Sequence, residues 1–431
     1  MSDPRGRLRA MDFSFLHAAD LHLDTPFAGL GALQPAVAAA LRDASLSAFD
    51  RLVDLAVQRR VAFVLLAGDL YDGPKRGLRA QLRFHRGMER LAAAGIGCFV
   101  VHGNHDPLEE GWSALRGFPA GVHVFGAGAP SSVPVVREGR CLAVVHGVSY
   151  GRREERENLA AAFRRGPEAV LQIGLLHAHV EGQQGHDPYA PCSLADLAAS
   201  GLDYWALGHV HDRQILARGP SWVVYPGNLQ GRSPKATECG AKGAVLVHVE
   251  AGAVAGVEFA PLAPVRFENL RVDAAGVGDL ASLERLVLER IRPVLLEPAV
   301  EGIVARLEIG GRAALHHDLA RGGGEELLAS LRDASAGSEP WVHWDRVAVG
   351  TSPPVDRAAL LARDDFAGEL LRRIDALQLR EEELAALVEG IDAPLLRGEI
   401  ARVLQPTDGE ERLALLRAAE RFALDRLGGE E

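Results

Sequence analysis

The sequence predicts an α/β fold: a layered core of mixed β-sheets flanked by helices, a smaller α+β accessory domain and a helical C-terminal segment. Three observations lead to this prediction. Short apolar runs alternate with amphipathic helical stretches over the first 260 residues. Near residue 265 the pattern changes to a strand, helix, strand, helix, strand order. After residue 354 only helical stretches follow, so the β-containing part of the fold is expected to end there.

The first domain, expected over residues 11–264, contains apolar runs of strand length. Helices are expected at about 34–60 and 77–94, between the first three runs. The later runs follow one another more closely, which suggests a more antiparallel second half. The runs lie at 13–16, 61–66, 96–101, 141–145, 171–176, 203–207, 222–225 and 243–249.

Residues 265–350 are predicted to form the accessory domain, whose size is close to the smallest that domains have. Its strands are expected at 266–272, 302–310 and 342–349, and its helices at 280–292 and about 314–332. The sequence Thr351-Ser-Pro-Pro354 then interrupts the chain. The segment 355–431 is predicted to be helical at about 357–378, 380–390, 394–404 and 408–427.

The composition excludes several classes of protein. No run approaches the ~20 apolar residues of a membrane helix. The basic N-terminus has no apolar segment behind it, as a secretory signal would. We therefore expect a cytoplasmic protein without membrane contact, which starts at Met1 or Met11. The four cysteines form no CxxC pair, which argues against a disulfide framework or a thiolate zinc site, and Cys98 and Cys141 are expected to be buried thiols.

The net charge of −11 argues against a surface coated with positive charge for non-specific nucleic-acid binding. Residues 351–431 contain 18 Asp and Glu against 11 Lys and Arg, so this segment is a poor candidate for contacting DNA. The rest of the chain is closer to neutral, which leaves room for a local basic groove.

Five short polar motifs each follow the end of a predicted strand. In an open α/β sheet these ends share one edge, so residues nearly 200 positions apart can converge on one site. Side chains two apart on an extended segment point the same way, and a glycine allows close backbone approach. The motifs are Asp20-Leu-His22, Gly68-Asp69, Gly103-Asn-His-Asp106, His177 and Gly208-His-Val-His211.

The residue types in these motifs suit two divalent cations. Carboxylate, imidazole and amide oxygen together favour a borderline or hard metal such as Mn²⁺. A carboxylate at Asp69 can bridge two cations about 4 Å apart, the usual separation in phosphoryl transfer. In contrast, His17, His102 and His146 lie within the strands, so we expect them to pack or to bond to backbone.

These motifs, in this order, resemble the calcineurin-like metallophosphoesterase superfamily. The match covers about residues 20–211, and the segments HAADLHLDTPF, LLAGDLYDG, VVHGNHDP and YPGNLQGRSPKATECGAKG are similar to its SbcD-type DNA repair exonuclease branch. The resemblance implies that His105 contacts the scissile phosphate or protonates the leaving oxygen, and that Asp106 orients His105. It assigns one metal to Asp20, His22 and His211, the other to Asn104, His177 and His209, and the bridge to Asp69.

The resemblance further implies a nuclease that hydrolyses DNA phosphodiester bonds beside an SMC-like ATPase, with a homodimer as the family's assembly. The accessory domain would cap the site. In the loop after residue 226, Arg232, Lys235 and Lys242 either meet a phosphate backbone or belong to an ordinary turn. The C-terminal helices either pack on their own domain or offer an apolar face to the ATPase.

Two other functions remain open, because the same metal centre serves several reactions. One is a phosphatase or phosphodiesterase acting on small molecules or phosphoproteins, which the overall acidity mildly favours. The other is a non-catalytic regulatory subunit of an ATPase, against which the complete ligand set argues.

Overall fold

The computed structural model describes residues 12–25, 27, 35–73, 76–109, 117–181, 189–395 and 409–427. The chain divides into two compact units. The first contains Met1–Asn269, Ile291–Arg306 and Arg332–Asp345, and the second contains Leu270–Arg290, Leu307–Leu331 and Arg346–Glu431. The domain boundaries predicted from the sequence stay a prediction.

The first sheet of the first unit has six strands in the order β12-β11-β1-β2-β3-β4. The pairs β1–β2, β2–β3 and β3–β4 are parallel, whereas β11 is antiparallel to both β1 and β12. The strands are β1 (Phe13–Ala18), β2 (Phe63–Ala67), β3 (Gly97–Val101), β4 (Val122–Val124), β11 (Gly243–Glu250) and β12 (Ala253–Pro261).

The second sheet also has six strands, in the order β5-β6-β7-β8-β10-β9. Its four central strands are parallel and its two edge strands are antiparallel. The expected more antiparallel second half therefore holds at the two edges of this sheet and at β11 and β12, but not for the four central strands. The strands are β5 (Ser131–Arg137), β6 (Arg140–Gly147), β7 (Leu171–His177), β8 (Tyr204–Gly208), β9 (Gln214–Ala217) and β10 (Trp222–Tyr225).

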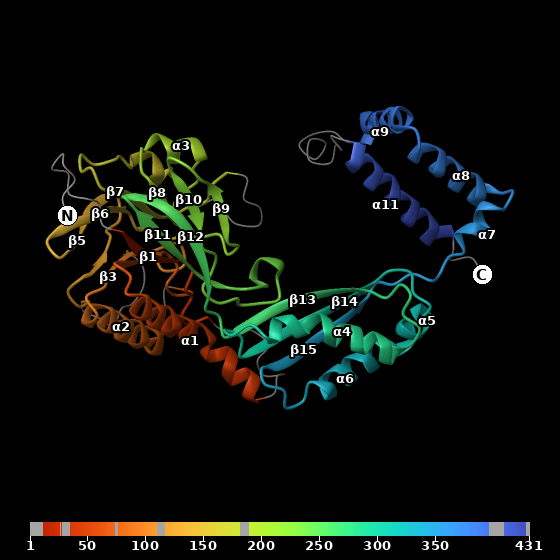
Figure 1. Ribbon diagram of the computed structural model, residues 1–431, viewed down its shortest axis with the longest axis horizontal. Coiled ribbons are helices and arrows are strands. Elements are labelled where there is room, and N and C mark those ends of the chain that lie inside the picture. The colour runs from red at the N-terminus through yellow and green to blue at the C-terminus, as the bar shows by residue number, and fades with distance from the viewer. Residues whose placement is uncertain are drawn as a thin grey trace. The chain divides into compact units, whose positions relative to one another are not determined.

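Alternating apolar residues place the two sheets face to face between helical layers. One side of β1, β2 and β3 packs against α1 (Pro35–Arg59) and α2 (Leu78–Ala93). The other side packs against the second sheet, where Phe15, Phe63 and Phe99 meet Ile173 and Tyr204. The outer face of the second sheet packs near α3 (Leu194–Ala199) (Figure 1). The predicted mixed α/β core flanked by helices is confirmed.

The remaining elements are a small sheet and a series of helices. A three-stranded sheet has the order β13-β14-β15, with strands Val265–Asp273, Gly302–Gly310 and Trp341–Val349. The C-terminal helices α8, α9 and α11 share an apolar cluster that contains Ile374, Leu384 and Leu416. The helices are α4 (Leu280–Leu295), α5 (His316–Asp318), α6 (Gly324–Ala334), α7 (Arg357–Leu361), α8 (Phe366–Gln378), α9 (Glu381–Leu395) and α11 (Gly409–Leu427).

Two predictions lie outside the described residues. One is the N-terminal extension before Met11. The other is the helix at 394–404, of which the structure describes only the first two residues, as the end of α9. Cys98 is buried as expected, but Cys141 is exposed, because the first residues of β6 lie at the surface. None of the helices in the described ranges combines the length and the apolarity that crossing a bilayer requires.

Candidate metal centre

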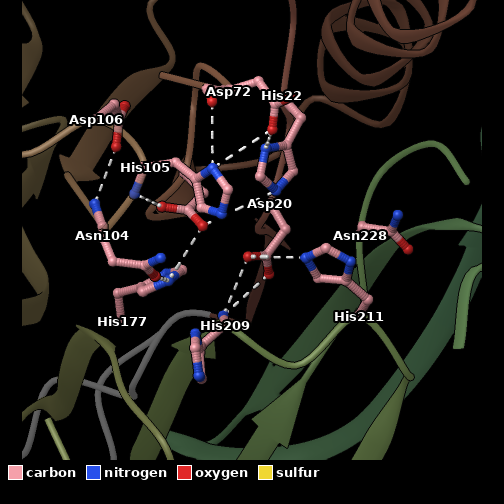
Figure 2. Close-up of polar contacts among 12 residues, drawn as sticks. Asp20, His22, Asp72, Asn104, His105, Asp106, His177, His209, His211 and Asn228 are labelled. Atoms are coloured by element: carbon pink, nitrogen blue, oxygen red, sulfur yellow. Dashed lines mark hydrogen bonds and ion pairs between the residues drawn. The ribbon is translucent and has the colours of Figure 1, made fainter. Parts of the chain in front are cut away.

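The polar motifs converge where strands of both sheets end. Asp20 follows β1, Asp69 follows β2 and Asn104 follows β3, all in the first sheet. His177 ends β7, and His209 follows β8 in the second sheet. Figure 2 shows the side chains of Asn104 and His177 in contact, with the side chain of Asp20 close to the backbone of His209. The centre therefore lies at the carboxyl ends of parallel strands, as the sequence predicts.

The backbone turns sharply at four of these residues. Asp20, His22, Asp69 and His209 have φ angles of 51°, 42°, 49° and 103°, in the left-handed region that non-glycine residues rarely adopt. Such a conformation costs roughly 1–3 kcal/mol per residue, so surrounding contacts must hold it. Among these contacts, the amide of Asp20 donates to the carbonyl of Gly68 at 3.1 Å, and that of His22 donates to the carbonyl of Asp69 at 3.0 Å.

Three glycines leave room for the ligands. A Cβ atom at Gly68 would lie 2.2 Å from Nδ1 of His177, and one at Gly103 would lie 2.3 Å from Oδ1 of Asp69. At Gly208 it would lie 1.7 Å from the carbonyl oxygen of Ala67. Because real Cβ contacts of this length do not occur, no larger residue fits these positions without moving the site.

The first group of candidate ligands consists of Asp20, His22 and His211, whose nearest possible ligand atoms all lie within 4.8 Å of one another. All three side chains are buried. Nε2 of His22 lies 3.9 Å from Oδ2 of Asp69, and Nε2 of His211 lies 3.8 Å from Oδ1 of Asp20. Within the described part of the chain, neither ring nitrogen of His22 meets the geometry of a hydrogen bond, although Nδ1 lies 2.9 Å from Oδ1 of Asp72. A buried imidazole nitrogen that faces carboxylates without a hydrogen bond fits a metal ligand.

The second group surrounds His177. Nδ1 of His177 donates to the carbonyl of Ala67 at 3.0 Å, which directs Nε2 into the site. Nε2 lies 3.0 Å from Oδ1 of Asn104 and 3.4 Å from Oδ2 of Asp69. The rings of His177 and His209 lie 5.2 Å apart. Asp69 therefore touches both groups, in the place where a bridging ligand is needed.

The electrostatics of the site favour a cation. Burial alone would raise the pKa of Asp69, but the imidazoles of His177, His105 and His22 hold it well below its usual range. Burial lowers the pKa of His177, but the neighbouring carboxylate of Asp69 outweighs burial and raises it to about 9. The buried carboxylates thus favour positive charge at His177. Divalent ions can supply that positive charge.

His105 lies beside both groups and is partly exposed. Its amide donates to Oδ1 of Asp69 at 3.0 Å. Its Nδ1 lies 3.2 Å from the carbonyl oxygen of Asp72 and 3.4 Å from Oδ1 of the same residue. The opposite ring nitrogen, Nε2, is thereby left for a group that enters the site.

The prediction that Asp106 orients His105 is wrong in this structure, where Asp72 faces His105. The carboxylate of Asp106 instead accepts hydrogen bonds from the amides of Leu70 and Gly103, at 3.1 and 3.0 Å. It also lies 2.9 Å from Nδ1 of His102, four residues away in the sequence. Asp106 therefore holds the loops after β2 and β3 together.

The other histidines expected to pack do so. Nδ1 of His17 bonds to the hydroxyl of Tyr204 at 3.1 Å, and its Nε2 bonds to the carbonyl of Leu207 at 3.2 Å. His146 bonds to Ser132 and Gln172, both at 2.7 Å.

Two carboxylates that support the ligands were missed by the sequence reasoning. Oδ1 of Asp72 lies 2.9 Å from Nδ1 of His22, so Asp72 supports both His22 and His105. Oε1 of Glu238 lies 2.8 Å from Nδ1 of His211. Carboxylates in such positions fix the ring and tautomer of a metal-binding histidine. Asp72 lies in the motif LLAGDLYDG and could have been found there, whereas Glu238 has no comparable local signal.

Arg232 joins these two carboxylates. Its Nη1 lies 2.6 Å from Oδ1 of Asp72, and its Nε lies 3.5 Å from Oε1 of Glu238. Arg232 and Lys235 line a cavity of about 330 Å³ together with Asp69, Asn104 and His105. The ammonium group of Lys242 is buried and donates to the carbonyls of His211 and Thr237, so this residue supports the loop from inside.

Comparisons with known proteins show which families this chain resembles. A family model described as calcineurin-like phosphoesterase matches residues 13–213, and one for the middle domain of metallophosphoesterase YhaO matches residues 267–352. An uncharacterised metallophosphoesterase, YhaO of Bacillus subtilis, is 36% identical over 91% of this chain and 94% of its own length. The DNA double-strand break repair protein Mre11 of Aeropyrum pernix is 28% identical, over 80% of this chain and 86% of its own. The SbcD component of the nuclease SbcCD from Escherichia coli is 27% identical, over 66% and 76%.

Proposed function

The chain belongs to the calcineurin-like metallophosphoesterase family, and from this premise we propose that it hydrolyses DNA phosphodiester bonds with two divalent metal ions. The observation that carries the proposal is the pair of ligand groups that share Asp69, with His105 beside them. The nitrogen and oxygen ligands suit Mn²⁺.

The residues of the site divide the chemistry between them. When bound, two divalent ions neutralise charge on the phosphate and activate water for in-line attack. Asp20, His22 and His211 would hold one ion, Asn104, His177 and His209 would hold the other, and Asp69 would touch both. Asp72 holds Nδ1 of His105, so Nε2 can contact the scissile phosphate or give a proton to the leaving oxygen. Asp72 and Glu238 keep the imidazoles of His22 and His211 in position.

Two observations support DNA as the substrate. Relatives named as a DNA double-strand break repair protein and as part of a nuclease align with most of this chain or about two thirds of it. Arg232 and Lys235 line the cavity in which His105 lies, so positive charge is available beside the place where a phosphate would bind. We extend the proposal to an SMC-like ATPase as partner, to a homodimer and to work in the cytoplasm, on the family resemblance alone.

The test is hydrolysis of end-labelled duplex DNA by the purified chain with Mn²⁺, beside bis(p-nitrophenyl) phosphate as a generic diester. Asp69→Ala removes the shared ligand. Asp43→Ala is its matched control, because Asp43 is an exposed aspartate paired with Arg79 outside the site. We expect metal-dependent shortening of DNA that Asp69→Ala abolishes and Asp43→Ala retains.

The other outcomes separate the alternatives. Turnover of the generic diester without DNA cleavage would favour a phosphatase or phosphodiesterase of small substrates. Metal binding without turnover of any phosphoester would favour the non-catalytic regulatory subunit.

A further inference from the structure

A second cavity of about 400 Å³ adjoins the metal centre, and all the residues that line it belong to the first unit. We propose that it binds the base of the nucleotide whose phosphate lies at the metal centre. This inference rests on the proposed function, because it names the part of the substrate that the metal centre itself does not contact.

The loop 231–238 is the wall between the two cavities. Arg232 lines both of them. Beyond it, Ser233 and Pro234 line the second cavity, whereas Lys235 and Glu238 line the cavity of the metal centre. The side chain of Arg232 therefore borders both a group in the second cavity and a phosphate at the metal centre, as one nucleotide that reaches into both cavities would require.

Backbone and side-chain hydrogen bonds fix the second cavity relative to the metal centre. The side chain of Gln230 donates to the carbonyl of Val265 at 2.6 Å, and the amide of Gly240 donates to the carbonyl of Phe267 at 2.9 Å. Both acceptors lie at the start of β13, whose Phe267 forms part of the cavity. The two ends of the loop are thus joined to the strand that carries the cavity.

The walls of the second cavity suit an uncharged, flat group with a polar edge. Its apolar part is formed by Phe27, Leu41, Phe267 and Val304, which belong to one buried cluster. Its polar part includes Arg306 and Asp345, whose Nε and Oδ2 atoms lie 2.6 Å apart. Arginine and carboxylate side chains can hydrogen-bond the acceptors and donors of a base edge, while apolar walls cover its faces.

The same walls disfavour a second phosphate. The carboxylate of Asp345 balances the charge of Arg306, so this pair adds no net positive charge. The neighbouring His343 has a lowered pKa because it is partly buried and lies near Arg332. A phosphate would therefore meet the carboxylate of Asp345 and guanidinium groups that carboxylates already pair with, Arg306 with Asp345 and Arg232 with Asp72. The volume lies in the usual range for small-molecule sites, roughly 300–1,000 Å³, and exceeds the need of one base.

The experiment compares the binding of four 2′-deoxynucleoside 5′-monophosphates with that of 2-deoxyribose 5-phosphate to the full-length chain in Mn²⁺, by calorimetry. The sugar phosphate offers the same phosphate without a base. Val304→Phe fills the cavity, and Asp345→Asn is a gentler variant that alters only its polar edge. Glu308→Gln is the matched control, because Glu308 pairs with Arg271 on the same sheet but does not line this cavity.

We expect at least one nucleotide to bind ~10-fold or more tightly than the sugar phosphate, as about 1.4 kcal/mol of added contact provides. Val304→Phe should remove this advantage without changing the affinity for the sugar phosphate, Asp345→Asn should reduce it and Glu308→Gln should keep it. Equal affinities in the wild-type chain, absence of binding by any of the ligands, or an advantage that survives both cavity variants would overturn the inference. A nucleotide advantage without DNA cleavage would refute the proposed nuclease while leaving the base site intact.

Discussion

Replacing Glu238 with glutamine tests whether the buried carboxylate behind His211 supports metal binding. Oε1 lies 2.8 Å from Nδ1 of His211. Oε2 accepts hydrogen bonds from the side chain of Asn228 at 2.7 Å and from the amide of Arg232 at 3.0 Å. Both oxygens of Glu238 therefore act as acceptors, and the residue is buried.

A glutamine cannot reproduce this arrangement in either orientation. If its oxygen faces His211, its NH₂ group meets two donors, from Asn228 and Arg232. If its NH₂ group faces His211, then Nδ1 must accept, and the proton moves to the nitrogen that should bind the metal. Hydrogen bonds to charged groups contribute about 1.5–3 kcal/mol each. Removing such a supporting residue typically costs about 10–100-fold in metal affinity or activity.

The measurement is the affinity for Mn²⁺, obtained by titration with electron paramagnetic resonance detection of the free ion. We expect Glu238→Gln to weaken the ion that His211 binds by about 10–100-fold. Glu258→Gln is the matched control, because Glu258 also faces a histidine, His248, at 3.2 Å, but at the surface. The reasoning would be refuted if the wild-type chain, Glu238→Gln and Glu258→Gln bound Mn²⁺ with affinities within about twofold of one another and had the same turnover. The hydrogen bonds of Glu238 could not then be coupled to metal binding.

Three further predictions concern the same site. Gly103→Ala should abolish turnover of DNA and of the generic diester, because its Cβ would lie 2.3 Å from Oδ1 of Asp69. Gly126→Ala is the control and should leave both activities unchanged, because a Cβ at this position meets no atom within 4 Å. His105→Gln should lower turnover by roughly 10²–10⁴-fold while Mn²⁺ titration still shows binding. Hydrolysis at the wild-type rate would rule out the role of His105 in contacting the phosphate or protonating the leaving oxygen. His85→Gln, on the surface of α2, serves as the control. Removing metal with a chelator should lower the midpoint of thermal unfolding, because buried carboxylates lose their counter-ions. Adding Mn²⁺ at 100 times its dissociation constant should restore about 2.7 kcal/mol of the free energy of unfolding. A chain with Asp69→Ala should show a much smaller response to Mn²⁺, and an equal response would contradict the assignment of Asp69 as the shared ligand.

Sequence reasoning brought the candidate ligands together because each motif follows a strand. Asp20, Asp69, Asn104 and His177 stand at or just after the ends of parallel strands, so the apolar pattern and the topology of α/β sheets were enough to bring them together. Most strands and helices could likewise be placed from apolar periodicity. The strand order could not be predicted in the same way. Short spacing between β8, β9 and β10 is compatible both with an antiparallel return and with a crossover to a parallel strand.

The errors at the site concern contacts made through the fold. Asp106 is next to His105 in the sequence, but its carboxylate turns to His102 and to the amide of Leu70, which lies 36 residues away. Glu238 reaches His211 across 27 residues of chain, and only the folded loop shows this contact. Arg232 could be expected to meet a phosphate on charge alone, yet its guanidinium also binds Asp72, which no local pattern indicates.

The order of strands in the first sheet has a consequence for synthesis on the ribosome. β1 lies between β2 and β11, and β11 is made only after all six strands of the second sheet. Until residue 250 has left the ribosome, one edge of β1 has no partner strand, and β1 leads directly into Asp20 and His22. Open strand edges invite pairing with other chains. A nascent chain therefore exposes an open strand edge beside its candidate metal ligands, and a truncation before β11 should yield an insoluble product rather than a smaller working domain.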